Sequence, residues 1–153
     1  LDTMAKLAEL PNIIGVKDAT ADLARPLALR NRVGDDFCQL SGEDATATAF
    51  LAQGGHGCIS VTSNVAPALC SQMHEAWQSD NKDGMEKCRD LLAPLHHALF
   101  VESSPAPVKY AASRLNLCTD HVRLPLVKAS ESCRKIVDQA LEYAALQPLK
   151  AAA

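Results

Sequence analysis

Three short apolar runs, each followed by a segment with the composition of a helix, place the strongest constraint on the fold of this chain. The runs occupy residues 12–17, 37–41 and 57–61, and the helices are predicted over about 22–32, 44–53 and 66–79. Strands that alternate with helices of this length form a parallel sheet, because a parallel strand pair needs a crossover connection. The sequence therefore predicts an α/β fold for its first 80 residues.

Local signals support these boundaries. Asp22 is a predicted N-cap of the first helix, and Pro26 falls in or just after its first turn, where a missing N–H group costs least. Gly54 and Gly55 are predicted to end the second helix. The helix signals thus agree with the apolar pattern.

No further strand is evident after Asp80. Three helices with apolar faces are expected over about 83–99, 106–115 and 130–146. Pro94 lies inside the first of them and should bend or break it. We therefore expect two domains, an α/β part over residues 1–80 and a helical carboxyl-terminal domain over residues 81–153.

Composition excludes several classes of protein. Hydrophobic residues make up 48% and charged residues 22% of the chain, which is typical of a soluble globular protein. No apolar run approaches the ~18 residues of a membrane span. The net charge of -3 comes without a basic block, which argues against nucleic acid as a partner. The six cysteines form no CxxC pair, so we expect them to be reduced in a cytoplasmic protein.

Lys17 is the first candidate for chemistry. It closes an apolar run and is expected at the carboxyl end of a buried parallel strand, where α/β barrels carry their catalytic groups. Apolar surroundings penalise the charged form of a lysine, and a neutral amine can attack a carbonyl carbon to form a Schiff base. The alternative is a lysine that pairs with Asp18 or extends into solvent.

Other polar groups have simpler interpretations. Glu43 and Asp44 precede a predicted helix, where acidic residues more often complement the helix dipole than act in acid–base catalysis. The glycine-rich segment 54–57 precedes a strand, which argues against a phosphate site. We expect no metal site, because the histidines have no metal-ligand spacing with each other or with cysteine. The histidines considered are His74, His96, His97 and His121.

Three motifs follow one another at fixed distances: GVKDAT at residues 15–20, LSGED at 40–44 and GGHGCISVTSN at 54–64. In this order and spacing they closely resemble the carboxyl half of the dihydrodipicolinate synthase family, within the pyruvate-dependent, Schiff-base-forming aldolases. The resemblance covers nearly the whole chain. Its late stretch, at residues 94–111 and 123–126, favours the synthases over the neuraminate-lyase and sugar-acid-aldolase types.

The resemblance implies the last three strand–helix units of a TIM barrel, followed by a helical extension. It makes Lys17 the residue that condenses with the keto group of pyruvate, Gly42 a backbone contact near pyruvate, and Ile59 a residue that packs against it. These roles fit the residue types, since glycine permits close approach of the main chain and an apolar side chain keeps water from an imine. Without the resemblance, the favoured interpretations are a turn glycine for Gly42 and a core side chain for Ile59.

The family further implies condensation of pyruvate with aspartate semialdehyde in lysine biosynthesis, a homotetramer, and no metal or organic cofactor. Its Thr pair, proton-relay tyrosines and carboxylate-binding arginine belong to the preceding half, so no residue of this chain can take those roles. Departures from the family pattern include Asp18, where glutamate is common, and Cys58, where valine is usual. Two alternatives remain open: another lyase with the same imine and a different aldehyde, or a non-catalytic fragment.

Overall fold

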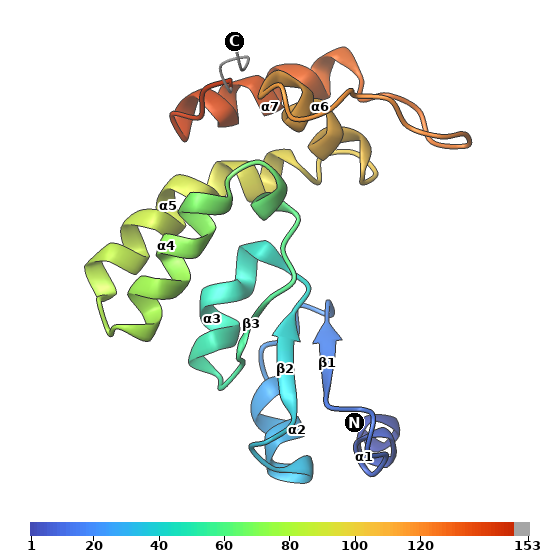
Figure 1. The fold of residues 1–153 in the computed structure, drawn as a ribbon, viewed down its shortest axis with the longest axis vertical. Helices are drawn as coiled ribbons and strands as arrows, with labels where there is room; N and C mark the ends of the chain where they lie inside the picture. Colours follow the sequence, from blue (N-terminus) through green and yellow to red (C-terminus); the bar gives the residue numbers. More distant parts are fainter. Residues whose placement is uncertain (149–153) are drawn as a thin grey trace. The chain divides into compact units, whose positions relative to one another are not determined.

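The computed structural model describes residues 1–148, which fall into two compact units. Unit 1 comprises residues 1–60, and unit 2 begins at residue 61. Both are drawn in Figure 1, and each is described by itself. The expected domain boundary at residue 80 falls inside unit 2.

Unit 1 contains the predicted parallel sheet. Its strands lie in the order β1-β2-β3, and both pairs are parallel, which confirms the α/β prediction. Figure 1 shows β1 and β2 side by side with their carboxyl ends pointing the same way. The elements are α1 (Asp2–Ala8), β1 (Gly15–Asp18), α2 (Arg25–Val33), β2 (Cys38–Ser41), the 3-10 helix η1 (Asp44–Thr46), α3 (Ala47–Ala52) and β3 (Gly57–Cys58).

The register of the strands fixes which side chains share a face. Lys17 lies opposite Leu40, Asp18 lies opposite Ser41, and Ser41 lies opposite Cys58. Because side chains alternate along a strand, the sheet has two different faces. The covered face carries the buried side chains of Asp18, Gln39 and Ser41, and the open face carries Gly15, Lys17, Cys38 and Leu40.

Helix α2 anchors to the covered face through a polar contact. Gln39 is only 2% exposed, and its side-chain amide donates a 3.0 Å hydrogen bond to the carbonyl oxygen of Pro26 in the first turn of α2. At the other end of this helix, Arg32 forms an ion pair with Asp2 of α1. Pro26 therefore lies where the sequence predicts it, in the first turn of a helix.

The sequence predicts that strand β1 is buried, but the structure shows it only partly buried. Lys17 is exposed, and Ile14, just before the strand, is 76% exposed. Among the described residues, β1 pairs only with β2, so one edge of β1 is unpaired. Strand β1 is therefore an edge strand of the described sheet, although its sequence is apolar.

Two boundaries also differ from the prediction. Helix α2 begins at Arg25, and Asp22 is not its N-cap, because the Asp22 carboxylate instead accepts a hydrogen bond from the Ala24 N–H group in the preceding turn. Strand β3 ends at Cys58 rather than at residue 61. The end of α3 is as expected, since Gly54 follows it with φ +93°, a conformation that favours glycine.

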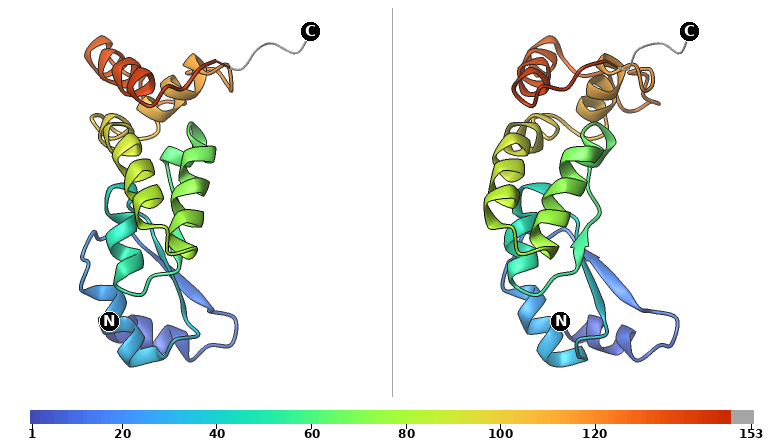
Figure 2. Two further views of the ribbon diagram at one scale, coloured as in Figure 1. Left: turned by 90° about the vertical axis from the view of Figure 1, so that its left-hand side faces the viewer. Right: turned by 60° about the vertical axis from the view of Figure 1, so that its left-hand side comes forward.

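Unit 2 is helical and contains no strand among its described residues, as the sequence predicts. Its elements are the 3-10 helix η2 (Thr62–Asn64), α4 (Pro67–Gln78), α5 (Lys82–Ala98), α6 (Ala106–Arg114) and α7 (Glu131–Tyr143). Helices α4 and α5 lie side by side in both views of Figure 2, and α5 and α6 each pack against α7. The core between these helices includes Leu92, Leu95, Leu99 and Val137, which are completely buried.

Pro94 does not break α5, which runs continuously from Lys82 to Ala98. Proline removes one backbone donor, but the neighbouring side chains of Leu92 and Leu95 are fully buried. Burial of two leucines contributes about 3–6 kcal/mol, which is comparable to or larger than the roughly 3 kcal/mol cost of an internal proline. Tertiary packing therefore overrides the local signal.

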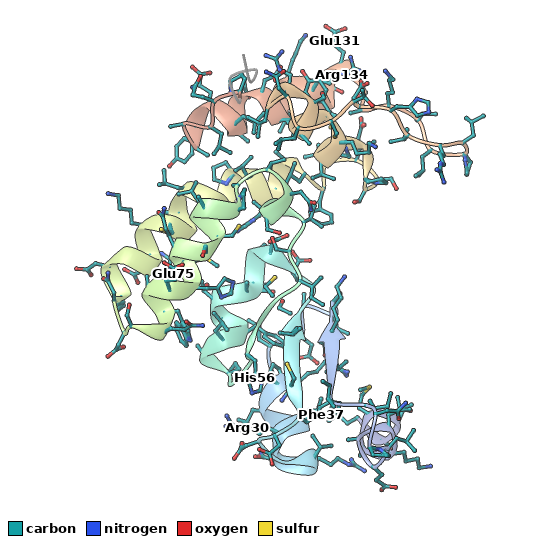
Figure 3. The ribbon with its side chains drawn as sticks, in the orientation of Figure 1. Arg30, Phe37, His56, Glu75, Glu131 and Arg134 are labelled. Atoms are coloured by element: carbon teal, nitrogen blue, oxygen red, sulfur yellow. The ribbon has the colours of Figure 1, made fainter. Side chains whose placement is uncertain are left out.

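A polar network joins α6 to α7 at the surface of unit 2. Asp138 accepts hydrogen bonds of 2.9 Å from the Tyr110 hydroxyl and 2.9 Å from Arg114 Nε. Arg134, labelled in Figure 3, lies over the Tyr110 ring at 5.2 Å from its centroid. Burial and the neighbouring Asp138 carboxylate raise the pKa of Tyr110 above its ordinary value, which favours the protonated hydroxyl that donates to Asp138.

We expect residues 1–153, expressed by themselves, to self-associate. An uncovered β1 edge offers unpaired backbone groups, and the exposed Ile14 adds apolar surface beside it. Sedimentation velocity should show dimers or larger species at micromolar concentration, and Ile14→Lys should reduce their fraction because a charge blunts strand pairing. A compact monomer that melts cooperatively would contradict this prediction.

Candidate active site

The three residues predicted to form the site lie at the same end of the sheet. Lys17 is the third residue of the four-residue strand β1, Gly42 directly follows β2, and Ile59 directly follows β3. Backbone hydrogen bonds hold the last two in place, from Gly42 N to Asp18 O at 2.7 Å and from Ile59 N to Ser41 O at 2.8 Å. In α/β folds, the carboxyl ends of parallel strands are where ligands bind and catalytic groups sit.

Gly42 gives the Lys17 side chain room to lie over the backbone after β2. A Cβ atom at Gly42 would lie 2.7 Å from Lys17 Cε and 2.7 Å from Ala19 Cβ, closer than nonbonded carbon atoms approach. Any larger residue would therefore displace the Lys17 side chain or the segment after β1. The close approach explains why glycine occupies this position.

Lys17 lies beside a shallow depression on the open face of the sheet. Its apolar surroundings come from β1, the segment before it, and β2, and Lys17 contributes the only charge among the described residues of the lining. An amine here is therefore next to apolar side chains while its end remains accessible. The lining consists of Asn12, Ile13, Ile14, Gly15, Val16, Lys17, Cys38 and Leu40.

Asp18 is directed to the covered face and is held by Arg25. Arg25 Nε donates to its carboxylate at 2.6 Å, and Thr20 donates from its backbone N–H at 2.9 Å and its hydroxyl at 2.6 Å. Burial by itself would raise the pKa of Asp18, but these hydrogen bonds outweigh it and hold the pKa below its ordinary value. The structure therefore pairs Asp18 with Arg25 and not with Lys17.

The two acidic residues after Gly42 have different roles. Glu43 accepts a 3.3 Å hydrogen bond from the Ala45 N–H group, so it caps η1 as its position before a helix predicts. Asp44 is only 6% exposed and accepts a hydrogen bond from the Ser60 hydroxyl. No local pattern predicts this second contact, because the two residues are 16 positions apart.

His56, labelled in Figure 3, has a structural contact in the loop before β3. Its Nδ1 atom accepts a 3.0 Å hydrogen bond from the backbone N–H group of Gln39 in β2. This contact supports the interpretation of residues 54–57 as a turn between α3 and β3. The sequence does not predict the contacts of Arg25 and His56. Their partners, Asp18 and Gln39, lie at spacings that do not indicate contact.

No group of three or more His, Cys, Asp or Glu side chains within residues 1–148 is arranged to hold a metal ion. In the same range, no helix has both the length and the apolar character that a membrane span requires.

The described residues define a parallel α/β protein whose candidate site lies at the carboxyl edge of its sheet. A sequence model described as the dihydrodipicolinate synthetase family matches residues 1–144, and the chain therefore belongs to this family. The chain is 65% identical to a 4-hydroxy-tetrahydrodipicolinate synthase of Rhodospirillum centenum, over 91% of this chain and 48% of that protein. It is 56% identical to the synthase of Gluconobacter oxydans, over 91% and 47%.

Solved structures of dihydrodipicolinate synthases also match the fold of this chain. The dihydrodipicolinate synthase of Aquifex aeolicus superimposes with a TM-score of 0.91 at 34% identity, over 97% of this chain and 51% of that chain. The Acinetobacter baumannii enzyme, solved in complex with pyruvate, superimposes with a TM-score of 0.88 at 37% identity, over 95% and 50%. The chain thus spans about half the length of the relatives that it matches.

We expect Asp18→Asn to destabilise the natural protein that carries this chain by about 1–3 kcal/mol at pH 7, because a buried charge-assisted contact with Arg25 is lost. The native pKa of Asp18 lies below its unfolded value, so this contribution is present above the unfolded pKa of about 3.9 and disappears as the pH falls through the native value. Urea unfolding at a series of pH values measures it.

The matched control is Asp36→Asn, an exposed aspartate that makes no hydrogen bond or ion pair among the described residues. The free energy of unfolding of the Asp36→Asn variant should equal that of the parent protein at every pH. A loss at pH 7 that persists unchanged in acid would show that the Asp18 charge is not what stabilises the fold.

Proposed function

We propose that this chain is the carboxyl-terminal half of a 4-hydroxy-tetrahydrodipicolinate synthase, which condenses pyruvate with L-aspartate 4-semialdehyde through a Schiff base on Lys17. The observation that carries the proposal is the placement of Lys17 over Gly42 at the carboxyl edge of three parallel strands. Membership of the family and relatives named as this synthase support it.

The proposal assigns the sheet to the last three strands of a TIM barrel. Consecutive parallel strands in the order β1-β2-β3, with helices between them, are the arrangement that a (β/α)8 barrel repeats. Further strands beside β1 and β3 would cover the open face and reduce the exposure of Lys17. The barrel part then covers residues 1–80, and the helical domain follows from residue 81; of the predicted range 81–153, residues 149–153 lie outside the described residues.

In the proposed reaction, the neutral amine of Lys17 attacks the keto carbon of pyruvate, and loss of water gives an imine. The protonated imine withdraws electrons, so the methyl group of pyruvate loses a proton and becomes the nucleophilic carbon of an enamine. This carbon adds to the aldehyde carbon of the second substrate, and ring closure releases the product from Lys17. The chemistry uses no metal or organic cofactor.

The two other site residues bind pyruvate in this proposal. The backbone at Gly42 lies beside the stem of Lys17, where a bound keto acid would meet it. Ile59 is 47% exposed at the end of β3, so its side chain is free to contact a substrate rather than being a core residue. An apolar group there would limit access of water to the imine.

The remaining properties are those of the family: a homotetramer in the cytoplasm that acts in lysine biosynthesis. One solved relative is described as a monomeric dihydrodipicolinate synthase variant. A relative solved with pyruvate bound supports pyruvate as the first substrate.

We expect Lys17, and no other lysine of this chain, to form the imine. The natural protein should be treated with pyruvate and borohydride, which reduces an imine to a stable amine, and its peptides should then be weighed. The adduct belongs on the peptide that contains residues 12–20. Lys17→Arg should abolish it, because arginine keeps the charge but offers no neutral amine.

Lys109→Arg is the matched control and should leave the adduct unchanged, because Lys109 belongs to helix α6 and not to a strand end. An adduct on another peptide, or none with pyruvate, would refute the proposed mechanism. A Lys17 adduct without turnover of aspartate semialdehyde would instead favour a lyase that uses a different aldehyde.

Gly42→Ala should slow imine formation by at least about tenfold, because the added methyl group occupies the space of Lys17 Cε and a misplaced reacting group costs up to about a hundredfold. The measurement is the rate at which the borohydride-trapped adduct accumulates. Gly57→Ala is the control on the same sheet, since its Cβ atom would meet only the end of the Leu40 side chain, at 3.2 Å. Equal rates in both variants would show that Gly42 is only a turn glycine.

A further inference from the structure

Asp44 is a buried carboxylate that the proposed reaction does not use. Its side chain accepts a hydrogen bond from the Ser60 hydroxyl, and the residue is 6% exposed. Burial of a carboxylate costs free energy unless hydrogen bonds compensate for its lost solvation. The contact with Ser60 supplies part of this compensation and links two loops of unit 1.

Each of these loops carries a residue of the proposed pyruvate site. Asp44 lies two residues after Gly42, and Ser60 lies one residue after Ile59. The loop after β2 is tightly closed, because the Ser41 hydroxyl donates to the Glu43 carbonyl oxygen at 3.0 Å and accepts from the Glu43 N–H group at 3.0 Å. The position of Asp44 is therefore closely tied to the position of Gly42.

Strand pairing alone holds Ile59 only loosely. Strand β3 consists of Gly57 and Cys58, and the ladder to β2 ends with one hydrogen bond, from Ile59 N to Ser41 O at 2.8 Å. Within unit 1, the contact between Ser60 and Asp44 is the next link along the chain. It ties the backbone after β3 to the loop after β2.

We propose that Asp44 is a positioning residue, which through Ser60 fixes Ile59 relative to Gly42 and so sets the width of the pyruvate site. The inference rests on the proposed function, because it assigns Gly42 and Ile59 to pyruvate. In this proposal Asp44 transfers no proton. It does not cap η1 either, because Glu43 already does so. Loss of the link leaves Lys17 in place and loosens only the wall that contacts pyruvate.

The test compares steady-state kinetics of the natural protein and of Ser60 variants, with pyruvate varied. Ser60→Ala removes the donor and should raise the KM for pyruvate about tenfold, while kcat changes less than about threefold, since one charge-assisted hydrogen bond is lost. Ser60→Thr keeps a hydroxyl and should restore the parent KM. The effects of Asp44→Asn and Ser60→Ala on the KM should be less than additive in the double variant, because both substitutions weaken the same contact.

Ser71→Ala is the matched control. Its hydroxyl also donates to a carboxylate, that of Glu75 at 2.7 Å, but on the exposed surface of α4, so the KM for pyruvate should not change. Where Ser60→Ala does not fold, Asp44→Asn gives the same comparison, because a carboxamide oxygen is a weaker acceptor than a carboxylate.

The outcomes separate this inference from the proposed function. Absence of a pyruvate adduct on Lys17 in the parent protein would refute both. A normal adduct together with an unchanged KM in Ser60→Ala would refute only the positioning role. A lowered melting temperature with an unchanged KM would likewise show that the contact between Asp44 and Ser60 is purely structural.

Discussion

Parallel backbone pairing of β1, β2 and β3 is the interaction on which the rest of unit 1 depends. The register places Asp18 beside Ser41 and Ser41 beside Cys58, so the three strands end at nearly the same level. Residues that are 42 positions apart in the sequence, Lys17 and Ile59, are thereby brought to one edge. Because every site residue lies at or just after a strand end, a change of register by one residue would disassemble the site.

The two faces of the sheet carry different kinds of residue: the covered face makes structural contacts, and the open face carries the candidate residue Lys17. On the covered face, Asp18 and Gln39 are buried and satisfied by Arg25 and Pro26 of the helix that follows β1. On the open face, Lys17 lies among apolar side chains with its amine accessible. Alternation along β1 therefore sends adjacent residues to opposite faces: Asp18 anchors the strand, and Lys17 remains exposed.

Much of the fold could be predicted because the signals were local and repeated. The alternation of strands and helices predicted the parallel sheet, and the glycines at 54 and 55 predicted the end of α3. Predictions failed where contacts between residues distant in the sequence decide the local structure or the exposure of a side chain. Packing of Leu92 and Leu95 keeps α5 from breaking at Pro94, and the unpaired edge of β1 leaves Lys17 exposed. A propensity of a few kcal/mol cannot reveal which long-range contact opposes it.

The sequence by itself determined the order of the elements, the family, and the candidates Lys17, Gly42 and Ile59, because apolar periodicity and motif spacing are properties of the chain. Only the tertiary structure decided how these residues are held. The close approach of Gly42 to Lys17 and the link from Asp44 to Ser60 join segments that are 25 and 16 positions apart. Such contacts depend on strand register and side-chain direction, and these are fixed only when the sheet has formed.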